Sequence, residues 1–151
     1  MALAPGDKAP DFTLLDQHGA PISLSSFRPR RVLVYFYPKA DTPGCTTQAC
    51  GLRDAAPEIG DTVVLGISPD KPKALERFDT KYSLGFPLLS DPDHAAADAW
   101  GVWGPKKMYG KTYDGIIRSA FLVDEHGDVE HAWYKISPAD TPTNLKAALA
   151  S

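Results

Sequence analysis

The segment from Arg31 to Tyr37 constrains the fold of this chain more than any other. Its sequence, Arg-Val-Leu-Val-Tyr-Phe-Tyr, places β-branched and aromatic side chains at successive positions rather than at alternate ones. Such a run is typical of a strand buried on both faces, at the centre of a sheet that helices cover. We therefore expect a layered α/β fold with this strand in the middle of a mixed sheet.

Strand and helix patterns alternate along the rest of the chain. After the central strand we expect a helix to about residue 58, a buried strand over 62–68, an amphipathic helix over 73–82, a short strand over 86–89 and a short helix over 93–100. The outer parts predict an N-terminal hairpin of 12–15 and 22–24, a long surface loop over 101–115, a second hairpin of 119–123 and 129–135, and a closing helix over 139–150.

Composition limits the classes of function. A chain of 151 residues, 43% hydrophobic, is long enough for one domain, which we place at 1–151. The net charge of −3, without a basic run, gives no indication of a nucleic-acid or membrane partner. The N-terminus does not resemble a signal peptide, so we expect a cytoplasmic protein. Two cysteines and four scattered histidines do not form a zinc pattern, and no cofactor is expected.

The segment Pro38-Lys-Ala-Asp-Thr42-Pro-Gly-Cys45 places a cysteine where a helix should begin. Thr42 is predicted to be the N-cap, with Pro43 at the first helical position. Cys45 then lies in the first turn, where the helix dipole stabilises a thiolate by about 0.3–1 kcal/mol. We expect a nearby cation to be needed as well, and Arg118, just before a buried strand, is the candidate.

An acidic thiol alone does not make a fast nucleophile. Intrinsic nucleophilicity falls as the thiolate fraction rises, so the net gain is only a few-fold. A larger acceleration requires donors that stabilise negative charge as it moves onto a leaving oxygen. The sequence offers the Thr42 hydroxyl, the backbone N–H groups around Gly44 and Cys45, and the Arg118 guanidinium.

Cys50, the only other cysteine, follows on the same predicted helix. Residues five apart on an α-helix have Cα atoms roughly 8–9 Å apart, whereas a disulfide needs less than about 7 Å. The two thiols can therefore join only if the helix unwinds. The glycines and threonines of the segment Gly44 to Gly51 cost roughly 4 kcal/mol in helix propensity relative to alanine, so local opening is expected.

Each of these residues also has an ordinary structural interpretation. A cysteine near a helix start is more often a small buried hydrophobe than a nucleophile, and Cys50 without Cys45 at this distance would favour a packing role. Thr42 alone is more often just a cap, Arg118 fits a surface ion pair, and Pro38 fits the end of a strand. It is their combination that favours a reactive site.

The pattern Pro38-x-x-x-Thr42-x-x-Cys45, with Arg118 downstream, resembles the active-site signature of the peroxiredoxins. Cys50, five positions after Cys45, is similar to the Q-type subgroup, also called bacterioferritin comigratory proteins. The resemblance covers most of the chain, and no motif position departs from the pattern. It implies a thioredoxin-like fold, with a central mixed sheet flanked by helices and an N-terminal β-hairpin.

The resemblance also implies an activity, the reduction of hydrogen peroxide and organic hydroperoxides in antioxidant defence. Cys45 would be the peroxidatic cysteine, oxidised to a sulfenic acid, and Cys50 would resolve it as an intramolecular disulfide. Thioredoxin or a similar dithiol would reduce that bond. Thr42 and Arg118 would hold the peroxide oxygens and the thiolate, while Pro38 would shield the pocket. Members of the subgroup are often monomers, and we expect a monomer here.

Other functions remain open at this point. A thiol–disulfide oxidoreductase is disfavoured because the Cys-x-x-Cys spacing is absent. A redox-sensing or partner-binding domain would be oxidised by peroxide without steady turnover. A purely structural domain is the least favoured, because so many motif positions coincide.

Overall fold

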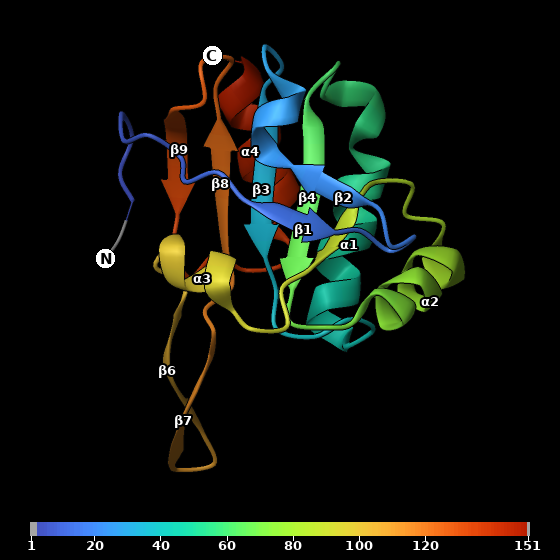
Figure 1. Ribbon diagram of the computed structural model, residues 1–151, viewed down its shortest axis with the longest axis vertical. Helices are drawn as coiled ribbons and strands as arrows, with labels where there is room; N and C mark the ends of the chain where they lie inside the picture. Colours follow the sequence, from blue (N-terminus) through green and yellow to red (C-terminus); the bar gives the residue numbers. More distant parts are fainter. Residues whose placement is uncertain (1–2, 151) are drawn as a thin grey trace.

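The structure, a computed structural model, describes residues 3–150 and is built on a seven-stranded mixed sheet of order β2-β1-β5-β4-β3-β8-β9 (Figure 1). Its three parallel strands are β3 (Val32–Phe36), β4 (Val63–Ser68) and β5 (Leu88–Ser90). The antiparallel strands are β8 (Ser119–Val123) and β9 (Val129–Trp133) beyond β3, and the hairpin of β1 (Thr13–Leu15) and β2 (Pro21–Ser23) beyond β5. The predicted mixed sheet, N-terminal hairpin and thioredoxin-like fold are confirmed.

Strand β3 is buried along its whole length, as its sequence predicts. Successive side chains point to opposite faces of the sheet, so the strand contributes to two separate cores. Leu33 and Tyr35 belong to the core on one face of the sheet, whereas Val34 and Phe36 belong to the core on the other face. An uninterrupted apolar run is what a strand between two such layers requires.

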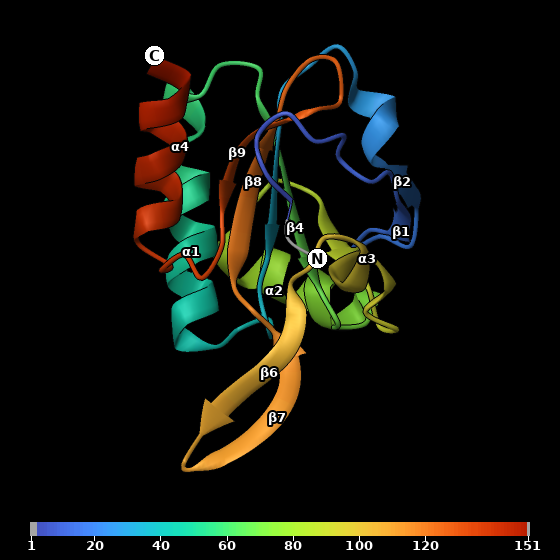
Figure 2. The same cartoon turned by 90° about the vertical axis from the view of Figure 1, so that its left-hand side faces the viewer.

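In the described part of the chain, four α-helices flank the sheet, α1 (Pro43–Asp54), α2 (Pro72–Tyr82), α3 (Ala95–Ala99) and α4 (Asp140–Ala150), together with the 3-10 turns η1 (Leu24–Phe27) and η2 (Ala56–Glu58). Helices α1 and α4 lie side by side on one face, and α3 lies on the other (Figure 2). No helix within residues 3–150 has the length and apolar character needed to cross a membrane.

The long surface loop predicted over 101–115 is wrong. The chain forms a two-stranded antiparallel ribbon there, of β6 (Trp103–Met108) and β7 (Lys111–Ile116), which projects from the body of the molecule in both views (Figures 1 and 2). Most of β7 is exposed to solvent. A strand without a buried face has no alternation of apolar and polar residues, which is the signal that sequence reasoning uses.

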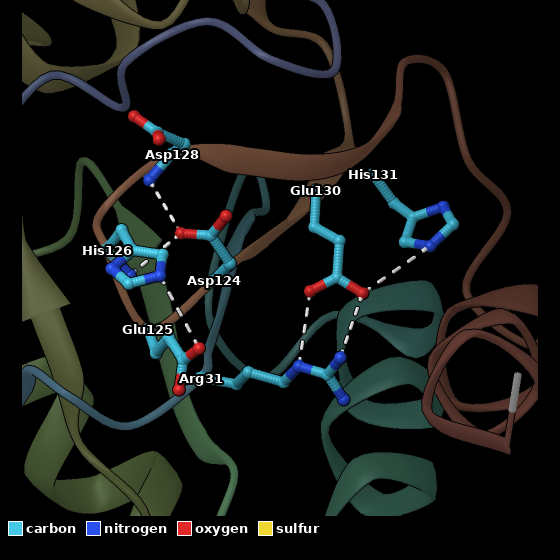
Figure 3. Close-up of polar contacts among 7 residues, drawn as sticks. All are labelled: Arg31, Asp124, Glu125, His126, Asp128, Glu130 and His131. Carbon is cyan, nitrogen blue, oxygen red and sulfur yellow. Dashed lines mark hydrogen bonds and ion pairs between the residues drawn. The ribbon is translucent and has the colours of Figure 1, made fainter.

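The turn between β8 and β9 organises the charged residues at one end of the sheet (Figure 3). The Asp124 carboxylate accepts hydrogen bonds from the backbone N–H groups of His126 and Asp128, at 2.9 and 3.0 Å, which confirms the predicted hairpin turn. Arg31, just before β3, forms an ion pair with Glu130 at 3.1 Å.

Within residues 3–150 no three His, Cys, Asp or Glu side chains are arranged to hold a metal ion.

Gly66 is required by the packing of the two central strands. It lies opposite Tyr35 in the β3–β4 ladder, and a Cβ atom at Gly66 would be 2.8 Å from Tyr35 Cζ. We expect Gly66→Ala to lower the free energy of unfolding by about 1–3 kcal/mol, as overpacking of a core does, in urea unfolding experiments. The matched control is Gly104→Ala in β6, whose Cβ would make only a 3.4 Å contact with Ile117. Equal stabilities of the two variants would contradict this explanation of Gly66.

Candidate active site

The two cysteines lie on α1, which starts just beyond the carboxyl end of β3. The buried side chains of α1 follow the three- and four-residue spacing of a helix face that packs against a sheet, and they are Cys45, Gln48, Ala49 and Leu52. Cys45 is 1% exposed and is the third residue of the helix, as predicted. A side chain at this position points back toward the first turn, whose backbone N–H groups have no acceptor within the helix.

The loop that leads into α1 is fixed at two points. The backbone N–H of Ala40 donates to the Asp70 carboxylate at 2.7 Å. The Asp41 carboxylate accepts from Lys81 Nζ and Tyr82 Oη of α2, both at 2.9 Å, and these hydrogen bonds hold the pKa of Asp41 below its usual value. Since Asp41 has a φ of 59°, in the left-handed region, such anchoring stabilises a turn that few side chains adopt.

Arg118 approaches Cys45 from the position just before β8, the strand that pairs with β3. The first residue of β8, Ser119, lies opposite Phe36 at the end of β3. The Arg118 Nη2 atom is 3.4 Å from Cys45 Sγ, within hydrogen-bond distance for sulfur. The predicted proximity of these two residues is thus confirmed, and the guanidinium places a permanent positive charge beside the sulfur.

Gln48 holds the other branch of the guanidinium, a role that was not predicted from the sequence. Arg118 Nη1 donates to Gln48 Oε1 at 2.7 Å, and Gln48 Nε2 donates to Thr141 Oγ1 of α4 at 2.9 Å. Both Gln48 and Thr141 are completely buried. One signal was available, because Gln48 lies three residues after Cys45 and therefore on the same face of the predicted helix.

Thr42 stands at the predicted N-cap of α1, but its side chain makes no capping hydrogen bond among the described residues. Its hydroxyl donates instead to the Lys39 carbonyl at 2.9 Å. The predicted N-cap position of Thr42 is therefore confirmed, although its side-chain oxygen accepts no hydrogen bond from the first turn of α1. With that proton engaged, the Thr42 oxygen presents lone pairs, so it can accept a hydrogen bond from a bound molecule.

Cys50 is half-buried near the middle of α1, and both cysteines are free thiols. It packs at the edge of the same core that contains Cys45. Since α1 is continuous between them, the helix must open before the two sulfurs can meet.

The core beneath α1 contains two buried tyrosines, Tyr35 and Tyr37, whose rings stack 5.4 Å apart. Burial raises the pKa of both hydroxyls well above the usual value for tyrosine, so both remain neutral at physiological pH. Neither tyrosine therefore adds a negative charge to the core beneath α1, whereas Arg118 places a positive charge beside Cys45.

A cavity of about 410 Å³ opens next to Arg118, between the start of the β6–β7 ribbon and the segment before α4. It is lined by Pro105, Lys106, Lys107, Ile117, Arg118, Lys135 and Ile136. Burial lowers the pKa of Lys106, and the charge of Arg118 adds to this effect. Pro38, the remaining predicted residue, is half-buried in the loop between β3 and α1, and its shielding role stays a prediction.

Known proteins are similar to this chain in sequence and structure over most of its length. The sequence profile of the AhpC/TSA family matches residues 5–132. Peroxiredoxin Bcp of Escherichia coli strain K12 is 56% identical over 133 residues, which cover 87% of this chain and 85% of that protein. The peroxiredoxin bcp of Haemophilus influenzae is 56% identical over 140 residues, covering 91% and 90% of the two chains.

Solved structures agree with the sequence comparisons. The bacterioferritin comigratory protein of Xanthomonas campestris superposes with a TM-score of 0.86 at 36% identity, covering 92% of this chain and 90% of that chain. A variant of Xylella fastidiosa PrxQ superposes with a TM-score of 0.92 at 28% identity, covering 99% and 97%. Similarity of this extent means that the chain belongs to the AhpC/TSA family and, within it, to the peroxiredoxin enzymes of the Bcp/PrxQ type.

Proposed function

We propose that this peroxiredoxin is an atypical two-cysteine peroxidase in which Cys45 attacks the hydroperoxide and Cys50 resolves the product. The Cys45 thiolate attacks one oxygen of ROOH, a sulfur–oxygen bond forms, and the O–O bond breaks. Cys45 becomes a sulfenic acid, and the other oxygen leaves as RO⁻, which takes up a proton to give ROH. The observation that carries this proposal is the 3.4 Å contact between Arg118 and Cys45 Sγ.

The polar groups around Cys45 have the properties that this step requires. Arg118 can stabilise the thiolate before the reaction and the negative oxygen that develops during it, because it always carries its charge. The Thr42 hydroxyl donates its own proton to the backbone carbonyl of Lys39. Its oxygen can therefore accept a hydrogen bond from the O–H group of the hydroperoxide. Pro38 would restrict water at the same pocket. Together these groups would orient the O–O bond toward Cys45.

In the second step, the Cys50 sulfur attacks the Cys45 sulfenic acid, and water leaves as the disulfide forms. This step requires α1 to open, and the helix is suited to it because the segment Gly44 to Gly51 has low helix propensity. Rapid capture by Cys50 would protect Cys45 from further, irreversible oxidation.

The expected substrates are hydrogen peroxide and organic hydroperoxides. The related Xanthomonas campestris protein is described in terms of its alkyl peroxide reduction activity, which supports the second class. Thioredoxin or a similar dithiol would reduce the Cys45–Cys50 disulfide and return both thiols to the starting state. We expect a monomer that works in the cytoplasm.

The two cysteines should differ when each is replaced by serine. Cys45→Ser should abolish peroxide consumption, because the remaining thiol, Cys50, lacks the contact with Arg118 that activates Cys45. Cys50→Ser should still reduce about one equivalent of peroxide per chain but should lose most of its turnover with thioredoxin and its reductase. Peroxide consumption in single-turnover and coupled assays measures both effects.

Two results would contradict this assignment of roles. Full turnover by Cys50→Ser would show that Cys50 is not needed for resolution. Reduction of a disulfide substrate by the wild-type protein, without steady peroxide turnover, would favour a thiol–disulfide oxidoreductase instead.

Opening of α1 should be visible as a loss of amide protection. After one equivalent of peroxide, we expect amides between Gly44 and Gly51 to exchange hydrogen at least about tenfold faster than in the reduced protein, since a disulfide cannot form on a wound helix. Hydrogen exchange followed by mass spectrometry measures this, with α2 as the internal reference. Unchanged protection of α1 in a chain that contains the disulfide would contradict the prediction.

A further inference from the structure

Thr141, on α4 beside α1, is linked to the reactive sulfur through a chain of hydrogen bonds that includes Gln48 and Arg118. Arg118 can only donate, so the Gln48 amide must turn its oxygen to Arg118 and its NH₂ group to α4. There the NH₂ group donates to Thr141 Oγ1 at 2.9 Å, and Thr141 in turn donates its own proton to the Ser137 carbonyl at 3.0 Å. Every donor and acceptor in this chain of hydrogen bonds has one consistent direction.

A backbone hydrogen bond also links Arg118 to the segment that leads into α4. The N–H of Ile136, one residue before Ser137, donates to the Arg118 carbonyl at 3.0 Å. The segment from Ile136 to Thr141 is therefore attached to Arg118 twice, once through the main chain and once through Gln48. Because Gln48 and Thr141 are fully buried, water cannot replace either partner while α1 is wound.

The start of α4 and the segment just before it also pack against α1, on both sides of Gln48. A Cβ atom at Gly44 would lie 3.4 Å from Pro138 Cγ, and a Cβ atom at Gly51 would lie 3.0 Å from Pro142 Cγ. The glycines thus allow α4 to approach closely along the part of α1 that contains both cysteines. In this approach, the side chain of Gln48 makes the buried polar contact between the two helices.

We propose that Thr141 is a positioning residue that holds α1 in its wound state through Gln48, and so sets how readily the Cys45 sulfenic acid meets Cys50. Gln48 lies between the two cysteines, so the helix cannot open for the disulfide without pulling Gln48 away from Thr141 and Arg118. The proposal rests on the two-cysteine function given above. It adds a residue on α4 that controls the choice between disulfide formation and overoxidation of Cys45.

The test uses the full chain with Thr141→Val, which removes the hydroxyl and keeps the side-chain shape. Thr143→Val is the matched control, because Thr143 bonds a carbonyl four residues back in the same helix but is exposed. Thr141→Ser, which keeps the hydroxyl, is the conservative rescue. Quenched samples analysed by mass spectrometry give the rate of disulfide formation and the fraction of Cys45 sulfinic acid over a series of peroxide concentrations.

We expect Thr141→Val to form the disulfide roughly three- to tenfold faster than the wild type, as loss of one buried hydrogen bond predicts. Its sulfinic acid fraction should fall by a similar factor, whereas Thr141→Ser and Thr143→Val should behave like the wild type. A partition between disulfide and sulfinic acid in Thr141→Val equal to that of the wild type would overturn the proposal, even if the variant is less stable. So would slower disulfide formation.

If Thr141→Val does not fold, Gln48→Met removes the same hydrogen bond from the side of α1, together with the bond that Gln48 accepts from Arg118. It should shift the partition toward the disulfide in the same direction, and an unchanged partition would overturn the proposal. A wild-type chain that forms no Cys45–Cys50 disulfide would instead overturn the two-cysteine function, so the two failures are distinguishable.

Discussion

The contact between the Arg118 guanidinium and the Cys45 sulfur is the interaction on which the other features of the site depend. It exists because β8 runs antiparallel to β3, which places the residue before Ser119 next to the loop that starts α1. The reactive cysteine and its cation thus come from segments more than seventy positions apart in the chain, and the sheet brings them together. A fixed cation in a largely buried site acts more strongly than one in water.

The same helix must meet two opposing requirements. It must be wound to hold Cys45 against Arg118, and it must open to let Cys50 reach Cys45. Its buried face of Cys45, Gln48, Ala49 and Leu52 and its contact with α4 favour the wound state, whereas its glycines and threonines favour opening. The helix is therefore stabilised by tertiary contacts rather than by its own propensity, and such contacts can be released locally.

Sequence patterns predicted the parts of the site that are local or belong to a strong motif. The buried run of β3, the helix start at Pro43 and the candidate cation Arg118 are all found where they were expected. Thr42 is also found at the predicted N-cap, but the hydrogen bond from its hydroxyl to the Lys39 carbonyl had no signal in the sequence.

The parts that could not be predicted depend on tertiary contacts or lack a periodic signal. The link from Gln48 to Thr141 joins residues 93 positions apart, and no local pattern marks it. The β6–β7 ribbon was missed because a two-stranded element exposed on most of its surface shows no hydrophobic alternation.

The most direct test of the account compares two reactions of Cys45 in the wild type and in Arg118→Lys. Lysine keeps the positive charge that favours the thiolate. It loses the planar set of N–H donors with which arginine can bind the sulfur, Gln48 and a developing oxyanion at the same time. The account predicts that the rate constant for one equivalent of hydroperoxide falls by about 10²-fold, while alkylation by iodoacetamide, which has no oxygen leaving group, changes far less. Equal losses in both reactions would contradict it, because Arg118 would then act only on the ionisation of the thiol.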